Sequence, residues 1–413
     1  MRKLHSWSIS FLLLTSVKSY ALEIDQTFLR TQITALESVQ EPEGAFYPHN
    51  CLNKAMTKLC YADKSLFFTG LIAESFLEVS DKASKNLKNK TLNYLADQFK
   101  QQDGIVKYYE TRGSLYKIVK PDVDDNGIVL SVLMNRPELV DQKLLSKRVQ
   151  ELYTNSKISQ KFYRKGSNKK ETFTGDYLST WVNPTRPFFN DIDLVVNFNG
   201  LLAFAKHNKN ADSKDKIDIT SVCSTVNKIV EWSSKDNFND LISIRHWTRR
   251  KKENYSQWYP SKYAVMLAIV RAHVEANEAS CIKSSYQLVR KHLLMTDNFE
   301  GNIYDQALAT AALARILKFE NLPKDALATQ ITKLHDMLEN NKLGKDPFFF
   351  YGAVGYTGSF PILRTLLIEA TATYLSQERR PASTEIDEKP FLDNILSEQM
   401  DDGSFTALIK PSS

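Results

Sequence analysis

The stretch Glu300–Lys318, EGNIYDQALATAALARILK, joins a short glycine turn to a helix-forming segment and decides the fold. Its apolar residues recur at steps of three and four, the spacing that places them on one face of an α-helix. The same spacing appears in Ser65–Glu78, Lys262–Asn277 and Leu363–Leu375. Strand-like alternation of apolar and polar residues is scarce. The sequence therefore predicts an all-α fold.

The glycine turn recurs along the chain. Its pattern is an acidic or polar residue, a glycine, an aromatic or apolar residue and then a helix. The glycines of the copies are Gly44, Gly104, Gly301 and Gly403, with a looser copy at Gly358. Neighbouring copies that lie roughly 45 to 60 residues apart fit a unit of two helices with their turns, which predicts about five to seven helical hairpins.

Two copies carry a glutamine shortly before the turn, at Gln101 or Gln102 and at Gln399. The C-terminal copy, QMDDGSF at 399–405, resembles the turn motif of squalene cyclases and protein prenyltransferases. Those families close their helical hairpins into an α/α toroid. The resemblance implies one α/α-toroid domain here, over residues 22–413. A generic glycine turn between helices is the alternative interpretation.

An acidic cluster, PDVDDNG at 121–127, stands directly before an apolar run. Like charges this close repel unless a proton, a cation or a set of donors offsets them. The cluster resembles the D-x-D-D motif of class II terpene cyclases, in which the middle aspartate gives its proton to an alkene or epoxide. The resemblance implies that Asp124 is the catalytic proton donor and that Asp122 and Asp125 set its pKa. Asn126 stands where that family usually has threonine.

A second cluster, Asn190–Asp193, also precedes an apolar helix. Aspartate at a helix start satisfies free N–H groups and the helix dipole, so plain caps are one interpretation of both clusters. Successive hairpins of a toroid would instead bring both clusters to one rim as an acidic mouth. A calcium-binding EF-hand loop beginning at Asp122 would need a closing carboxylate at Leu133. We predict no cofactor, although a divalent cation shared by the two clusters stays an alternative.

Aromatic residues surround these clusters. They would stabilise a carbocation through their π faces, or stack on a sugar, whereas packing in the core is the structural alternative. The substrate-binding candidates are Tyr108, Tyr109, Trp181, Arg186, Asp191, Asp193, Trp258 and Tyr259.

The N-terminus predicts export. Arg2 and Lys3 precede an apolar stretch at 7–17 that is too short to span a bilayer, and Ser19-Tyr20-Ala21 is a small-x-small cleavage site. We predict a signal peptide over residues 1–21 and an exported chain, periplasmic or secreted, with no later transmembrane segment.

Four cysteines suit an oxidising compartment and two disulfides. Cys51 with Cys60 and Cys223 with Cys281 is one pairing, and the other two pairings stay open. The cysteines and histidines lack the spacing of a zinc site. The formal net charge is +6, and the basic runs at 165–170 and 249–252 have no nucleic-acid-binding module around them.

Three functions follow. The first is an exported terpene-cyclase-like protein in which Asp124 acts as a Brønsted acid on an isoprenoid-type substrate. The second is a non-catalytic toroid that binds a lipid, glycan or peptide. The third is a glycan-processing enzyme with paired carboxylates from the two acidic clusters. Whether the chain is an enzyme stays open, as does its oligomeric state. The expected partner is a small apolar or glycan ligand and not a nucleic acid.

Overall fold

The computed structural model describes residues 22–113, 116–163, 172–183, 192–241, 258–276, 280–299, 301–345, 347–352 and 355–378. The predicted signal peptide, the two basic runs and the turn at Gly403 lie outside these residues. The chain divides into two compact units, Met1–Leu375 and Ser376–Ser413, and the packing described below belongs to the first. A single domain reaching residue 413 stays a prediction.

The fold is mainly helical, as predicted. Helices that the sequence placed at Ser65–Glu78, Lys262–Asn277, Tyr304–Lys318 and Leu363–Leu375 are confirmed as α2, α8, α10 and α12. The α-helices of the described residues are α1 (Gln26–Glu37), α2 (Leu66–Leu77), α3 (Lys85–Gln101), α4 (Val123–Leu133), α5 (Gln142–Ser156), α6 (Leu194–Asn210), α7 (Thr220–Ser234), α8 (Lys262–Ala276), α9 (Lys283–Leu294), α10 (Ile303–Glu320), α11 (Asp325–Glu339) and α12 (Phe360–Glu378). Short 3₁₀ helices lie at Lys82–Ser84, Ser213–Asp215 and Asn239–Leu241. None of the described helices is both long and apolar enough to cross a membrane.

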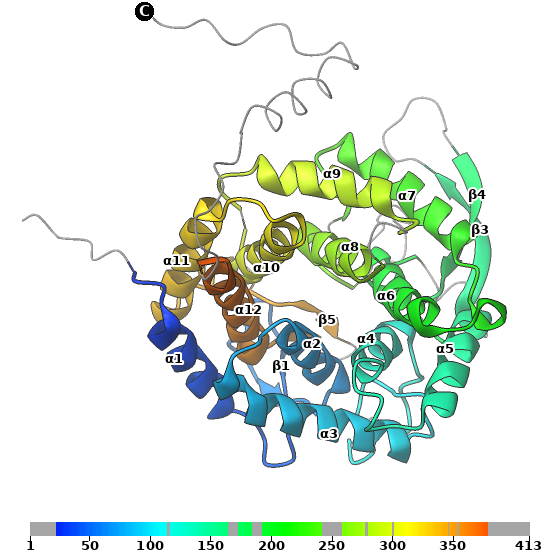
Figure 1. The fold of residues 1–413 in the computed structure, drawn as a ribbon, viewed down its shortest axis with the longest axis horizontal. Helices are drawn as coiled ribbons and strands as arrows, with labels where there is room; N and C mark the ends of the chain where they lie inside the picture. The colour runs from blue at the N-terminus through cyan, green and yellow to red at the C-terminus, as the bar shows by residue number, and fades with distance from the viewer. Residues whose placement is uncertain are drawn as a thin grey trace, which may run out of the picture. The chain divides into compact units, whose positions relative to one another are not determined.

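The helices form two layers, and their sequences explain which layer each joins. In α4 every residue from Val123 to Leu133 is buried, whereas α5 buries four residues on one face. A helix that is apolar on all sides belongs in the interior, and an amphipathic helix belongs at the surface. Figure 1 shows the even-numbered helices around the centre and the odd-numbered helices outside them. Neighbouring inner helices from α2 to α10 pack against one another in chain order.

Three of the predicted glycine turns share one place in this arrangement. Gly44, Gly104 and Gly301 have φ angles of +105°, +79° and +131°, and each lies between an outer helix and the inner helix that follows it. Glycine adopts such angles without a steric penalty. Between α11 and α12 the positive angle occurs at Gly344, with φ +77°, and not at Gly358. The turn thus leads the chain inward, toward the starts of the inner helices.

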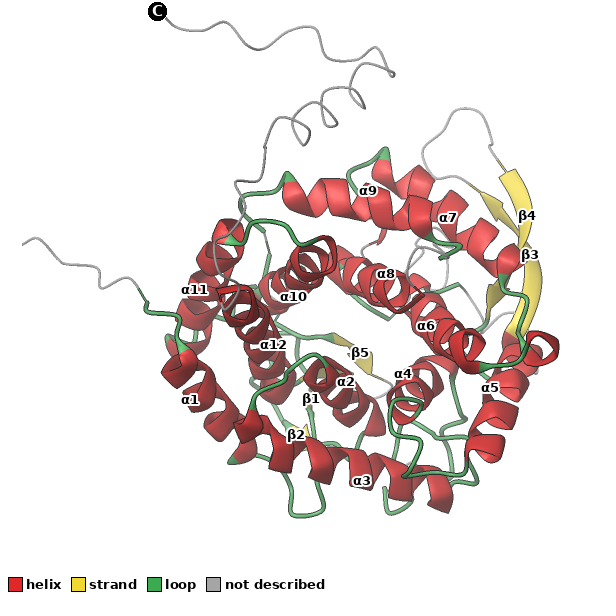
Figure 2. Ribbon diagram, in the orientation of Figure 1, coloured by secondary structure: helices red, strands yellow, loops and turns green. Residues whose placement is uncertain are grey.

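Two small sheets were not predicted (Figure 2). Strands β1 (His49–Cys51), β2 (Tyr61–Ala62), β5 (Phe350–Gly352) and β6 (Gly355–Gly358) form a sheet in the order β2-β1-β6-β5. Its antiparallel pair His49 and Gly358 joins the α1–α2 connection to the α11–α12 connection. Strands β3 (Lys157–Tyr163) and β4 (Thr172–Leu178) form an antiparallel hairpin whose β4 packs on α7. The strands of the first sheet, with two to four residues each, are too short to give a clear alternation.

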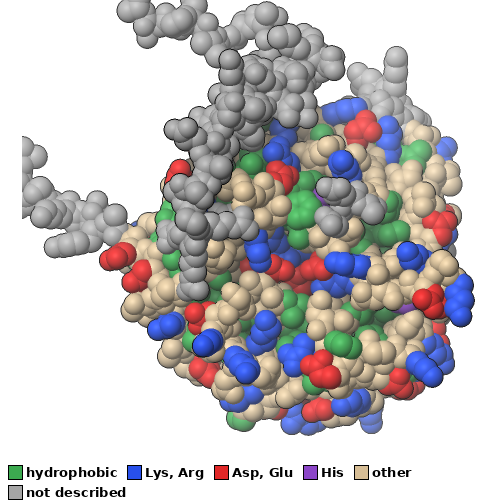
Figure 3. Space-filling view, in the orientation of Figure 1, with side chains coloured by type: hydrophobic (Ala, Val, Ile, Leu, Met, Phe, Trp, Pro, Cys, Tyr) green, Lys and Arg blue, Asp and Glu red, His purple; other side chains and the backbone are tan. Residues whose placement is uncertain are grey.

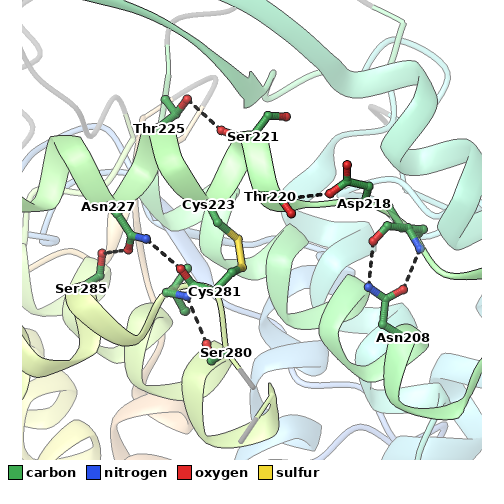
Figure 4. Close-up of a disulfide and its surroundings, with 12 residues drawn as sticks. Asn208, Asp218, Thr220, Ser221, Cys223, Thr225, Asn227, Ser280, Cys281 and Ser285 are labelled. Carbon is green, nitrogen blue, oxygen red and sulfur yellow. Dashed lines mark hydrogen bonds between the residues drawn. A yellow bond between two sulfur atoms is a disulfide. The ribbon is translucent and has the colours of Figure 1, made fainter. Parts of the chain in front are cut away.

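The disulfides are Cys51–Cys60 and Cys223–Cys281, which confirms one of the pairings left open by the sequence. The first closes the loop between β1 and β2. The second joins α7 to the segment before α9, and side-chain hydrogen bonds support it (Figure 4). Asn227 donates to the carbonyl of Cys281 at 2.8 Å and accepts from Ser285 at 2.6 Å. The bridge therefore ties two outer helices together.

Candidate active site

The start of α4 carries the acidic cluster. Asp122 is the helix N-cap, and its Oδ1 accepts a hydrogen bond of 2.7 Å from the backbone N–H of Asp125. The predicted cap is therefore present at one aspartate. Asp124 and Asp125 lie in the first turn with only 8% and 1% of their surface exposed. Capping does not account for these two buried carboxyl groups.

A second segment runs alongside this helix start. The backbone N–H of Val123 donates to the carbonyl of Thr180 at 2.8 Å, and that of Val182 donates to the carbonyl of Pro121 at 3.1 Å. Asp122 and Trp181 form the antiparallel bridge between the two segments. The backbone thus holds Thr180 and Trp181 beside the acidic cluster.

The carboxyl group of Asp124 is held from two other parts of the chain. Its Oδ1 accepts a hydrogen bond of 2.6 Å from Nδ2 of Asn199, which lies in α6. Its Oδ2 accepts a hydrogen bond from the hydroxyl of Tyr259, which stands just before α8. Residues of α4, of α6 and of the segment before α8, which are distant in sequence, therefore meet at one carboxyl group.

Burial and crowding shift the protonation of the cluster. Burial, followed by the charge of Asp122, raises the pKa of Asp124 to about 8 against the hydrogen bonds of Tyr259 and Asn199. Burial raises the pKa of Asp122 to about 6. Burial and the two neighbouring aspartates raise the pKa of Asp125 well above its ordinary value. Near neutral pH the repulsion predicted from the sequence is therefore relieved by bound protons.

A cavity of about 110 Å³ opens onto these carboxyl groups. It brings together eight of the predicted site residues: Tyr108, Tyr109, Asp122, Asp124, Asp125, Trp181, Trp258 and Tyr259. The remaining lining residues are Asn50, Asp63, Phe67, Val119, Thr180, Val196 and Phe350. Most of the wall is aromatic or aliphatic, and the polar groups gather at the starts of α2 and α4.

Aromatic rings are packed edge-on around this cavity. The ring centroids of Tyr108 and Tyr109 are 4.8 Å apart, and those of Trp181 and Trp258 are 6.4 Å apart, in both cases with steeply inclined planes. Tyr259 packs against Phe350 at 6.1 Å. Such packing holds the rings in fixed positions, so the shape of the cavity is set before a ligand arrives.

Asp193 is held elsewhere. It is the N-cap of α6, where its Oδ1 accepts hydrogen bonds from the backbone N–H groups of Val195 and Val196 at 2.9 and 3.4 Å. Its Oδ2 accepts from the backbone N–H of Trp258 at 2.9 Å. Asp193 is not among the residues that line the cavity, and Arg186 and Asp191 lie outside the described residues. The second acidic cluster thus contributes a cap that also positions Trp258.

Sequence reasoning did not select Asp63. This residue is 5% exposed, and Asn50 donates a hydrogen bond of 2.6 Å to its Oδ2. Burial raises its pKa to about 6. The available signal was an acidic residue shortly before the apolar helix α2, two residues ahead of its N-cap Ser65. Asn199 was also missed as a site residue, although a polar side chain within an apolar helix is itself a signal.

Within the described residues, no group of three or more His, Cys, Asp or Glu side chains is arranged to hold a metal ion. The stretch from Asp122, which matches only the first half of an EF-hand loop in sequence, continues as helix α4 from Val123, so the loop that such a site requires does not form.

Proteins of known structure resemble this chain only distantly. No family model and no curated protein matches the sequence. Similar solved structures include ent-copalyl diphosphate synthase from Streptomyces platensis, with 14% identity over 75% of this chain and 50% of that chain and a TM-score of 0.44. Another is an unsaturated glucuronyl hydrolase specific for heparin, with 13% identity, coverages of 87% and 98% and a TM-score of 0.46. A possible GH105 family member from Klebsiella pneumoniae has 9% identity, coverages of 91% and 100% and a TM-score of 0.47. We assign no activity from these similarities.

Proposed function

We propose that the inner helices close as a single α/α toroid whose cavity protonates an uncharged, largely apolar substrate of isoprenoid type through Asp124. The observation that carries this proposal is the buried Asp124 carboxyl group, which faces an aromatic-lined cavity with its pKa raised to about 8. A general acid must hold its proton at working pH and lie in contact with the substrate. Asp124 meets the first condition near neutral pH and its position in the wall meets the second.

The groups around Asp124 can stabilise its carboxylate and the positive charge on the substrate after proton transfer. The O–H bond of Asp124 breaks as the substrate gains the proton, and a positive charge develops on the substrate while a carboxylate remains. Asn199 and Tyr259 already donate to the two oxygens that then carry the negative charge. The faces of Trp and Tyr rings stabilise a nearby cation. Quenching of that cation returns a proton to Asp124 or to water.

The charge of the cavity limits the substrate. Lys and Arg are absent from the fifteen described residues that line it, whereas Asp63 and Asp122 have pKa values of about 6 and carry negative charge above that pH. A phosphate or carboxylate on the ligand would meet repulsion without a compensating cation. The reacting part of the substrate is therefore uncharged.

Export is part of the same proposal. The predicted signal peptide and the disulfides Cys51–Cys60 and Cys223–Cys281 both suit an oxidising compartment, so we propose that the protein acts in the periplasm or outside the cell.

Glycan processing is the second candidate, and Asp63 is the observation that favours it. Asp63 and Asp124 line the same cavity and come from segments near the starts of two different inner helices. Many glycosidases likewise use two carboxyl groups that flank one site. The aromatic wall would then stack on a sugar ring. The catalytic pair would then be Asp63 with Asp124, because the carboxyl group of Asp193 accepts hydrogen bonds from the backbone N–H groups of Val195 and Trp258.

The test uses protein purified from its native compartment. Bound molecules are extracted from wild type and from Asp124→Asn and identified by mass spectrometry, and each is then incubated with fresh enzyme in D₂O. We expect wild type to place one solvent deuterium in its product and Asp124→Asn to form no product. Asp141→Asn, which alters an exposed N-cap outside the cavity, should behave as wild type. Equal products from wild type and Asp124→Asn would refute the role of Asp124. Sugar products that require Asp63 as well would support the glycan candidate.

A further inference from the structure

Several polar atoms in the cavity wall lack hydrogen-bond partners. They are the hydroxyl of Tyr108, the hydroxyl of Thr180 and Oδ2 of Asp125. Thr180 and Asp125 are 4% and 1% exposed, and the atoms themselves are buried in all three residues. A buried polar group without a partner costs about 1–3 kcal/mol, so a folded protein rarely keeps several of them together without a use.

These atoms lie around the same part of the cavity. The backbone pairing of Thr180 with Val123 places Thr180 beside the first turn of α4, where Asp125 lies. Tyr108 lines the same cavity, and burial followed by the charge of Asp63 raises the pKa of its phenol well above the ordinary value. The three residues thus border the acidic end of the cavity.

All three groups are donors when protonated. A tyrosine or threonine hydroxyl can donate or accept, and burial with the neighbouring aspartates holds the proton on Asp125. A set of unpaired neutral donors calls for an acceptor. A carboxylate or phosphate would also accept, but Asp63 and Asp122 make the site unfavourable for an anion.

We propose that the ligand of this cavity carries an uncharged oxygen function, a carbonyl, ether, epoxide or hydroxyl group, which lies against Tyr108, Thr180 and Asp125 on an otherwise apolar skeleton. The inference rests on the proposed function and adds one feature to its substrate, an uncharged oxygen group. It makes Tyr108 and Thr180 specificity-determining residues, because each distinguishes an oxygenated molecule from a hydrocarbon of the same shape. The acid then acts at this oxygen or at a carbon next to it.

The test compares two probes that differ in one group, cyclohexanone and methylenecyclohexane. Their dissociation constants are measured by NMR titration of the whole folded chain, with no turnover required. A hydrogen bond contributes about 1 kcal/mol, so we expect wild type to bind the ketone at least roughly fivefold more tightly than the hydrocarbon. Tyr108→Phe and Thr180→Val should each remove most of this preference and leave hydrocarbon binding unchanged.

Stability measurements separate a specificity role from a structural one. Removing an unpaired buried hydroxyl leaves nothing unsatisfied, so Tyr108→Phe should keep or raise the melting temperature. Tyr153→Phe, which loses a hydroxyl bonded to the carbonyl of Asp218 outside the cavity, is the matched control and should keep the ketone preference. Equal binding of both probes by wild type, or an unchanged preference in the Tyr108→Phe/Thr180→Val double variant, would overturn the inference. Loss of the Asp124 role in the deuterium experiment would leave this preference intact.

Discussion

The hydroxyl of Tyr259 donates a hydrogen bond to Oδ2 of Asp124, a residue 135 positions earlier in the chain. The bond joins the segment before α8 to the first turn of α4, and both residues line the cavity. It stabilises the carboxylate more than the carboxylic acid, and so it opposes the burial that keeps Asp124 protonated. The balance between these two influences sets the pH at which Asp124 gives up its proton.

Replacing Tyr259 by phenylalanine should therefore raise the pKa of Asp124 further. Burial and the charge of Asp122 remain, while one hydrogen bond to the carboxylate is lost. The measurement is an NMR titration of protein labelled with ¹³C at the aspartate carboxyl carbons. Tyr153→Phe serves as the control because its hydroxyl lies outside the cavity. An Asp124 signal that titrates at the same pH in Tyr259→Phe as in wild type would contradict the expected role of the bond.

The buried aspartates of the cavity should contribute less and less to the stability of the protein as the pH rises from about 4 to 8. The folded-state pKa is raised to about 6 for Asp63 and Asp122 and to about 8 for Asp124, from an ordinary value of 3.8. The folded state therefore binds more protons than the unfolded state in this window. Each extra bound proton lowers the free energy of unfolding by at most about 1.4 kcal/mol per pH unit.

Urea denaturation at pH 5, 6.5 and 8 measures this slope. Glu74 has its pKa lowered to about 2 from 4.5, so its contribution is lost only below this window. Asp124→Asn removes one of the titrating groups and should flatten the slope between pH 6 and 8. An equal slope between pH 6 and 8 in wild type and Asp124→Asn would show that Asp124 is already ionised in the folded protein.

The acidic cluster was predictable because carboxylates within four residues of one another stay close in space whatever the fold. Tyr108, Trp181 and Trp258 were also found, since each stands beside a turn or a helix start where a ring can reach a cavity. What the sequence could not supply was the pairing across the chain. Asn199 reaches Asp124 only because α4 and α6 pack side by side, and that packing is a property of the folded structure.

The four-stranded sheet also depends on pairing between distant parts of the chain. Strands β1 and β6 pair His49 with Gly358, and both strands are too short to show a strand pattern in the sequence. This pairing places Asn50 in the wall, where it donates to Asp63. Asp63 was therefore missed for a physical reason, because its burial depends on a contact between opposite ends of the chain.

Gly127→Ala should separate α4 from α6. A Cβ atom at Gly127 would lie 2.5 Å from the backbone oxygen of Asn199, well inside van der Waals contact. The helices must move apart, at a cost of about 1–3 kcal/mol, and Asn199 is the residue that donates to Oδ1 of Asp124. We expect a lower urea midpoint together with a changed pKa of Asp124. Lys147→Ala, at an exposed position of α5, is the control and should change neither the urea midpoint nor the pKa of Asp124 appreciably.

The final prediction concerns charges buried between the inner helices. Arg315 of α10 binds Glu74 of α2 through two hydrogen bonds of 2.7 and 2.8 Å and binds Glu369 of α12 at 2.5 Å. Arg271 of α8 lies 3.4 Å from Glu74. These side chains are at most 6% exposed. Figure 3 shows acidic and basic side chains gathered over the centre of the helices. The ion pairs thus link α2 to α8, α10 and α12.

Glu74→Gln should destabilise the protein by about 3–5 kcal/mol, because it leaves two buried guanidinium groups with too little negative charge. Lys318→Ala breaks the more exposed pair with Glu78 and should cost less than about 1 kcal/mol. Urea denaturation at pH 7 compares the two variants. The double variant Glu74→Leu/Arg315→Met removes both sides of the strongest pair, but Arg271 and Glu369 then lose their partners, so it should recover only part of the stability lost in Glu74→Gln. Similar losses in Glu74→Gln and Lys318→Ala would mean that the charges between the inner helices are solvated, and the helices would then owe their packing to apolar contacts alone.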